Sequence, residues 1–132
     1  YLRARVMGSS SVEEALFEAV KATLIFTPTP AATRAASIRM LANMPGITVT
    51  ENTTDPAGRP ATKVAFVDDK HRPGIVNAIY LDPVTTKIVA ELQTQNGQPY
   101  YTCIYTERRI VGSLPDDIIK TLGADRIEKS IP

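Results

Sequence analysis

The feature that most constrains the fold is a change in hydrophobic period at Gly46. Before this glycine, apolar residues recur every three or four positions, as on one face of an α-helix. After it, apolar and polar residues alternate, as in a β-strand with one buried face. Two helices followed by consecutive strands, without alternating β-α-β units, predict an α+β fold with an antiparallel sheet. The same order argues against a parallel nucleotide-binding sheet.

Local signals place the two N-terminal helices. The capping box Ser11-Val12-Glu13-Glu14 predicts the start of the first helix, which the segment 27–30 ends. Thr29 as N-cap and Pro30 at the first helical position predict a second helix, which ends at 43–46. Because the link between them is short, we expect the two helices to pack as neighbours on the sheet.

The rest of the chain reads as an antiparallel meander of about five strands and a short C-terminal helix. The strands are predicted at 47–50, 62–67, 75–81, 87–94 and 100–111. Asn96-Gly97 is a strong signal for a two-residue hairpin turn between the last two strands. Simple alternation predicts that the fourth strand presents three apolar side chains on one face: Ile88, Ala90 and Leu92. The last helix is expected between Ser113 and Gly123.

Size and composition limit the function classes. A chain of 132 residues with 43% hydrophobic residues predicts a single globular domain over residues 1–132. A formal net charge of +1 provides no field to gather phosphates, so nucleic acid is not an expected partner. One cysteine, Cys103, and one histidine, His71, exclude a disulfide scaffold and a zinc module. Without nucleotide-binding or hydrolase motifs, we expect no cofactor, no bound metal and no enzymatic activity.

Tyrosines from two strands are the first candidate for a binding surface. We expect Tyr80, Tyr101 and Tyr105 on the open face of the sheet, where they form an interaction surface for an unknown protein partner. A homodimer formed through the same surface is a further alternative. Ordinary packing of these tyrosines within the sheet is the alternative interpretation.

A second hypothesis is an apolar groove between sheet and helices that binds a small apolar or lipid-like molecule. Its expected lining is Phe17, Leu24, Phe26, Ile79 and Ile88. A domain of this size has few apolar residues to spare, so a solid core made of the same residues is the competing interpretation. An enzyme is the third hypothesis and rests only on His71 beside Asp68 and Asp69, which a solvated hairpin loop explains equally.

Three turn segments carry a family resemblance. They are Met44-Pro45-Gly46-Ile47, Thr54-Asp55-Pro56-Ala57-Gly58-Arg59 and Leu81-Asp82-Pro83-Val84-Thr85-Thr86, within a match from about Ser11 to Leu92. The chain resembles the C-terminal extracytoplasmic domain of an uncharacterised actinobacterial family of single-pass membrane-anchored proteins, often encoded near extracytoplasmic-function sigma factors. Thr86 departs from the glycine of that family, and the final helix is not one of its features.

The resemblance implies a location and no chemistry. Since the chain begins at Tyr1 and not at methionine, we expect a fragment of a longer protein, tethered to the cell membrane from outside the cytoplasm through an N-terminal anchor. The family has no established activity, so no catalytic residue is carried over. The resulting hypothesis is a non-catalytic extracytoplasmic domain that serves as a protein-interaction or regulatory module.

Overall fold

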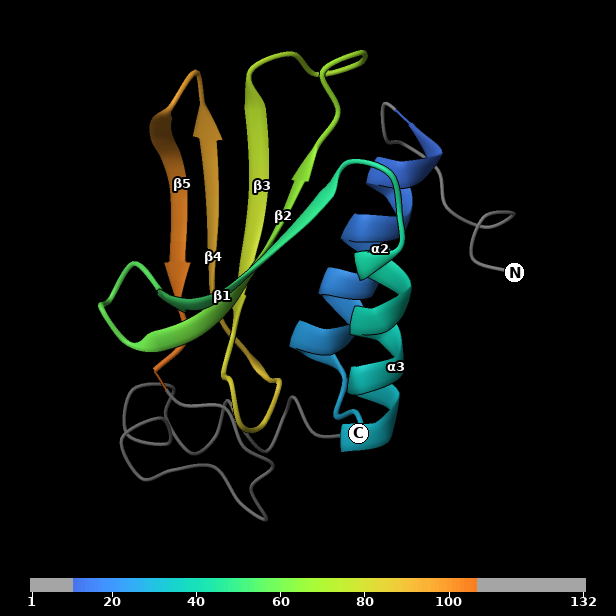
Figure 1. Cartoon of the computed structure of the whole chain (residues 1–132), viewed down its shortest axis with the longest axis vertical. Coiled ribbons are helices and arrows are strands. Elements are labelled where there is room, and N and C mark those ends of the chain that lie inside the picture. Colours follow the sequence, from blue (N-terminus) through green and yellow to red (C-terminus); the bar gives the residue numbers. More distant parts are fainter. Residues whose placement is uncertain (1–10, 107–132) are drawn as a thin grey trace, which may run out of the picture.

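The structure, a computed structural model, describes residues 11–106 and confirms the α+β class. Helices α2 (Val12–Phe26) and α3 (Ala31–Ala42) precede a five-stranded antiparallel sheet in the order β1-β2-β3-β4-β5 (Figure 1). The strands are β1 (Ile47–Thr54), β2 (Pro60–Val67), β3 (Ile75–Leu81), β4 (Ile88–Gln95) and β5 (Gln98–Ile104). The predicted C-terminal helix and residues 107–111 of the last predicted strand lie outside the described residues.

The start of α2 agrees with the predicted cap, whereas the start of α3 differs from it. The Ser11 hydroxyl accepts a hydrogen bond from the backbone N–H of Glu14 at 3.1 Å, which confirms the predicted cap of α2. The second helix begins one residue later than predicted, with Pro30 as an N-cap that has no side-chain hydrogen bond. The Thr29 hydroxyl donates to the carbonyl of Thr27 instead. Local bonding within the linker therefore replaces the expected cap.

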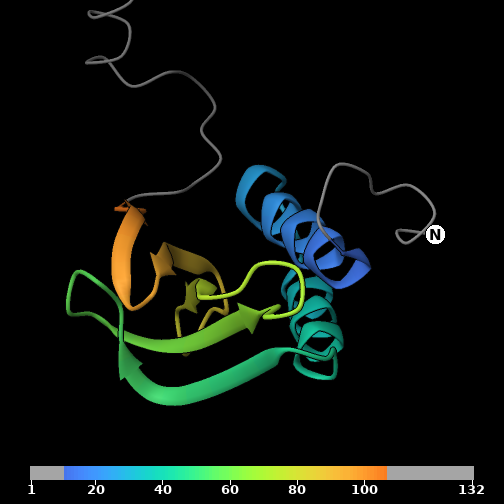
Figure 2. The ribbon, with the colours of Figure 1, turned by 90° about the horizontal axis from the view of Figure 1, so that it is seen from above.

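Both helices lie on one side of the sheet, as Figures 1 and 2 show from two directions. Between the two layers lies the main core, a cluster of apolar side chains from α2, α3 and the three middle strands. It comprises Phe17, Val20, Leu24, Ile25, Leu41, Val64, Phe66, Ile79, Leu81 and Ile88. The rings of Phe17 and Phe66 stack with centroids 5.4 Å apart.

A second, smaller cluster lies on the opposite face of the sheet. It contains Tyr80 and four small residues, Ala61, Ala65, Ala78 and Ala90, all buried. The tip of the β1–β2 hairpin reaches across to the end of β5, where Arg59 donates to the carbonyls of Tyr105 and Val89 at 3.0 and 2.8 Å. Small side chains permit this close approach, and the hairpin tip shields part of the face that we expected to be open.

A β-bulge in β4 overturns the predicted alternation of that strand. Tyr80 pairs with Ala90, but its neighbour Leu81 pairs with Ile88, so Val89 is the extra residue. The bulge turns Ile88 into the main core while Ala90 and Leu92 face the other cluster. The prediction that Ile88, Ala90 and Leu92 share a face is therefore wrong.

Turn residues carry the backbone conformations that the hairpins require. Asn96 and Gly97 both have positive φ, 51° and 82°, as a type I′ turn demands. Thr86 in the β3–β4 turn also has a positive φ of 61°, which is unusual for a β-branched residue. Thr86 thus occupies a position that favours glycine.

Candidate functional site

The most distinctive surface of the described chain is β5, an edge strand of the sheet. Three of its large side chains are exposed: Tyr100, Tyr101 and Ile104, at 52%, 45% and 41%. The N–H of Tyr105 donates to Val89 in β4 at 2.9 Å. Because backbone groups alternate sides along a strand, the N–H and C=O groups of Thr102 and Ile104 point away from β4. Among the described residues, no strand pairs with that side of β5.

The hairpin that carries this edge is nearly free of charge. Residues 88–105 contain a single charged residue, Glu91, whereas a segment of this length at the chain's average of 22% charged residues would contain about four. Glu91 is buried and paired internally. The remaining polar groups are amides, hydroxyls and phenols. Depletion of charge together with exposed tyrosine is the composition found at the centres of protein interfaces.

The opposite edge of the sheet, β1, has features that discourage pairing. The pairing with β2 is interrupted by a register shift between Thr50 and Thr53, with Asn52 at a positive φ of 54°. Glu51 places a charge on the same strand. Bulges and charges are the usual protection of edge strands against unwanted association. The two edges therefore differ: β1 also exposes Val49, but it carries Glu51 and a register shift within the strand, whereas β5 has no charged residue and exposes three large side chains.

A buried polar network supports β5 from the side of the helices. The ammonium of Lys21 in α2 lies 2.9 Å from the carboxylate of Glu18 and 3.3 Å from that of Glu91 in β4. The second Glu91 oxygen accepts a hydrogen bond from the Tyr105 hydroxyl. The thiol of Cys103 adjoins the phenols of Tyr105 and Tyr101. This network ties α2, β4 and the end of β5 together.

The carboxylates of the network shift the pKa values of Lys21 and of two tyrosines. Burial alone would lower the pKa of Lys21, but Glu18 and Glu91 together hold that pKa above its ordinary value. Burial and the hydrogen bond to Glu91 raise the pKa of Tyr105 well above its usual value. The charge of Glu91 also raises the pKa of Tyr101. Near neutral pH, Lys21 is protonated and both phenols are neutral. The ion pair of Lys21 with Glu91 and the hydrogen bond from Tyr105 to Glu91 therefore hold the end of β5 against β4 and α2.

The three predicted tyrosines do not share one face. Tyr101 pairs with Gln93 and stands on the helix side of the sheet, where it is exposed. Tyr105 is half-buried and bonded to Glu91 on that side. Tyr80 is only 6% exposed and belongs to the cluster on the other face, because it opposes Ala90 and the hairpin tip lies over that region. The prediction that all three lie on the open face is therefore wrong, since Tyr101 and Tyr105 lie on the helix side and Tyr80 is buried on the other; the exposed tyrosines are Tyr100 and Tyr101.

The five residues of the predicted apolar groove are also not together. Four of them, Phe17, Leu24, Ile79 and Ile88, pack against one another in the main core and are at most 5% exposed. Phe26 is 81% exposed. It lies two residues beyond Leu24, about 200° around the helix, and so faces away from the core. This packing favours the solid core over a ligand groove.

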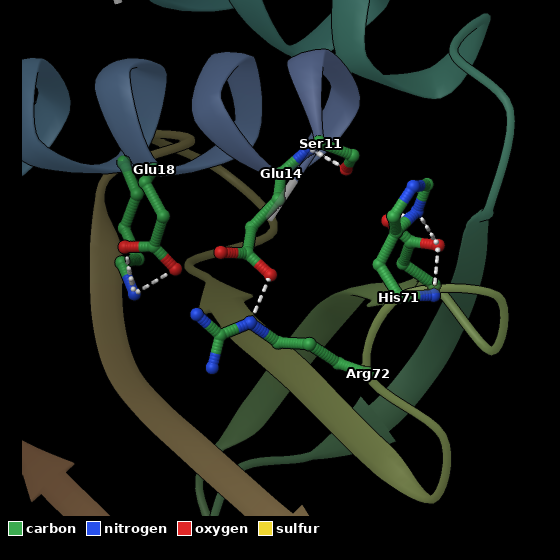
Figure 3. Close-up of polar contacts among 7 residues, drawn as sticks. Ser11, Glu14, Glu18, His71 and Arg72 are labelled. Carbon is green, nitrogen blue, oxygen red and sulfur yellow. Dashed lines mark hydrogen bonds and ion pairs between the residues drawn. The ribbon is translucent and has the colours of Figure 1, made fainter. Parts of the chain in front are cut away.

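The His71 cluster forms a local loop contact near the start of α2. The ring Nδ1 of His71 lies 3.0 and 3.1 Å from the two carboxylate oxygens of Asp68, and hydrogen bonds from Ser11 and His71 lower the pKa of Asp68. Arg72 forms an ion pair with the buried carboxylate of Glu14 at 2.6 Å (Figure 3). These contacts fasten the β2–β3 loop to the helix, and Asp69 is exposed to solvent.

Sequence reasoning missed Lys21 and Glu91, the centre of the polar network. Each is a single charged residue in an apolar pattern, a signal that marks a buried charge only when its partner is known. Within residues 11–106, no group of three or more His, Cys, Asp and Glu residues is placed to hold a metal ion. In the same part of the chain, no helix has the length and apolar character needed to cross a membrane.

Comparisons with protein-family models, curated proteins and solved structures found no match to this chain.

Proposed function

We propose that this chain is a non-catalytic protein-interaction module that binds through the β5 edge. The observation that carries the proposal is that a strand without charged residues presents outward backbone groups at Thr102 and Ile104 and exposed side chains at Tyr100 and Tyr101. An open edge offers backbone hydrogen bonds to an added strand, and tyrosines give contact area at a low entropy cost. The buried network behind β5 holds this surface in place.

The location belongs to the same proposal. The three turn segments that resemble the actinobacterial membrane-anchored family support an extracytoplasmic domain of a longer, tethered and regulatory protein. The strained Thr86, at the position of the family glycine, adds support because its positive φ is a conformation that glycine adopts freely. A tethered domain would meet its partners at the membrane surface, where confinement raises the effective concentration.

Site-specific photo-crosslinking tests the interaction surface. A photoreactive phenylalanine derivative replaces Tyr100 in one variant and, as the control, Val49 on the β1 edge, which is 41% exposed. Both variants are irradiated in the cells in which the protein occurs, and adducts are separated by mass. We expect adducts from position 100 in clear excess over position 49. Equal yields at the two positions would contradict the proposal.

A further inference from the structure

We propose that the partner strand at this edge is β5 of a second copy, so that two five-stranded sheets join into one antiparallel sheet of ten. The inference rests on the proposed function, because it names the partner of the same surface. It follows from the outward direction of backbone groups that no described strand pairs with, from the absence of charge along the strand and from the contrast with β1.

The backbone geometry selects one register. A bulge between Gln93 and Thr94 interrupts the pairing of β5 near Pro99, so regular outward groups belong to Thr102 and Ile104. A two-fold axis beside Cys103 sets Thr102 of each copy opposite Ile104 of the other. Both residues then exchange N–H···O=C bonds with the second copy, which uses all four outward groups of each strand. An axis beside Thr102 would instead require Tyr100, which lies at the bulge.

The charge pattern suits a symmetric contact. In a two-fold interface each patch meets its own copy, so a charged strand would oppose like charges. The strand Gln98–Ile104 contains no charged residue, and the only charge in residues 88–105, Glu91, is neutralised by Lys21 inside each copy. Exposed Ile104 and Thr102 form the cross-strand pair on the face away from the helices. The edge is therefore self-complementary, whereas Glu51 and the bulge of β1 oppose the same arrangement there.

The size of the contact sets its strength. A seven-residue strand is about 23 Å long, and one strand pair buries less than the roughly 800 Å² per partner of a standard interface. We therefore expect a weak, reversible dimer, with a dissociation constant in the range of about 10–500 µM. Such a dimer forms readily between chains confined at one membrane and dissociates on dilution.

Sedimentation equilibrium between 5 µM and 1 mM tests the dimer. We expect the average mass of the unaltered chain to rise from one copy toward two across this range. Ile104→Lys should keep the chain monomeric throughout, with unchanged circular dichroism. The matched control Val49→Lys, an aliphatic residue of the same 41% exposure on the other edge, should dimerise as before. Thr102→Lys provides a second variant at the edge, should Ile104→Lys reduce folding.

A disulfide between the Cys103 residues of two copies tests the register of the proposed dimer. Opposed residues that are not hydrogen-bonded to each other have Cα atoms about 4.5 Å apart, within the span of a disulfide. Mild oxidation with diamide, which accepts the two electrons and two protons released by two thiols, should yield a covalent dimer through Cys103. Ile104→Lys should lower the yield at least fivefold, and Val49→Lys should not. Equal yields in the unaltered chain and Ile104→Lys, or a monomer at 1 mM, would overturn the inference.

The crosslinking adducts separate this inference from the proposed function. An adduct from position 100 with twice the mass of the protein supports both. Adducts that contain only another protein overturn the second copy as partner and leave the interaction surface in place. A yield no higher than that of the Val49 control overturns both.

Discussion

Arg59 ties the tip of the β1–β2 hairpin to the ends of β4 and β5, and its replacement should be among the most destabilising single changes in the chain. Its guanidinium donates to the carboxylate of Asp55 at 2.6 Å and to two backbone carbonyls at the end of the sheet, those of Tyr105 and Val89. The Asp55 side chain is completely buried and also accepts the N–H groups of Ala57 and Arg59. Arg59→Ala removes one donor from each of three acceptors: the carboxylate of Asp55 and the carbonyls of Tyr105 and Val89.

The magnitude follows from the burial of the two partners. Loss of one partner of a fully buried ion pair costs about 3–5 kcal/mol, but Arg59 is 37% exposed and water replaces part of its bonding. We therefore expect Arg59→Ala to lower the free energy of unfolding by about 2–3 kcal/mol, which corresponds to a fall in Tm of roughly 10–20 °C. Arg59→Lys, which keeps the charge but not the three-way geometry, should cost about half as much.

The pH dependence identifies the partner of Arg59. Burial alone would raise the pKa of Asp55, but hydrogen bonds from Arg59 and Ala57 hold it below the ordinary value. A lowered folded-state pKa adds stability that is complete above the unfolded value of about 3.9 and is lost as the pH falls through the folded value. The difference in free energy of unfolding between the unaltered chain and Arg59→Ala should therefore be constant from pH 8 to pH 5 and should shrink below pH 4.

Chemical denaturation at several pH values measures both effects, with Arg39→Ala on the exposed side of α3 as the control expected to change stability by less than about 0.5 kcal/mol. A loss in free energy of unfolding below about 1 kcal/mol for Arg59→Ala would refute the reasoning. A loss that does not change between pH 6 and pH 3 would refute it as well.

Three further changes test other parts of the structure by thermal or chemical denaturation. Lys21→Met leaves Glu91 buried without its cation and should lower the free energy of unfolding by about 3 kcal/mol. The double variant Lys21→Met with Glu91→Gln should recover at least half of that loss. A loss below about 1 kcal/mol in the single variant would argue against the buried pair. Thr86→Gly relieves the positive φ and should stabilise by about 0.5–1 kcal/mol, so that a loss of stability would show that the Thr86 contacts outweigh the strain. Gly46→Ala should destabilise by more than about 2 kcal/mol, because a Cβ collides with the carbonyl oxygen of Val67 and φ is +85°; an unchanged Tm would contradict it.

The element order could be predicted because it depends on local periodicity and on turn residues. The change of period at Gly46, the cap at Ser11 and the Asn96-Gly97 turn each act within a few residues, and the structure confirms all three. The pairing of consecutive strands then follows from short connections, which favour neighbours in an antiparallel meander.

The candidate site could be predicted only in part, since it depends on contacts between distant residues. No local signal marks Val89 as a bulge, yet that one residue decides which face Ile88 occupies. The burial of Tyr80 depends on the reach of the hairpin tip through Arg59, about 30 residues away in sequence from its acceptor Val89. Tyr101 is exposed as predicted, because an edge strand has a neighbour on one side only, but it lies on the helix side of the sheet and not on the open face.

The most direct test of the central claim is residue-resolved amide hydrogen exchange by NMR at two protein concentrations. The claim is that β5 is the edge at which this chain pairs, so the outward amides of Thr102 and Ile104 should exchange fast at 20 µM and at least several-fold more slowly at 1 mM. The outward amide of Val49 on β1 should exchange equally fast at both concentrations. Unchanged exchange at Thr102 and Ile104, or equal slowing at Val49, would contradict the account.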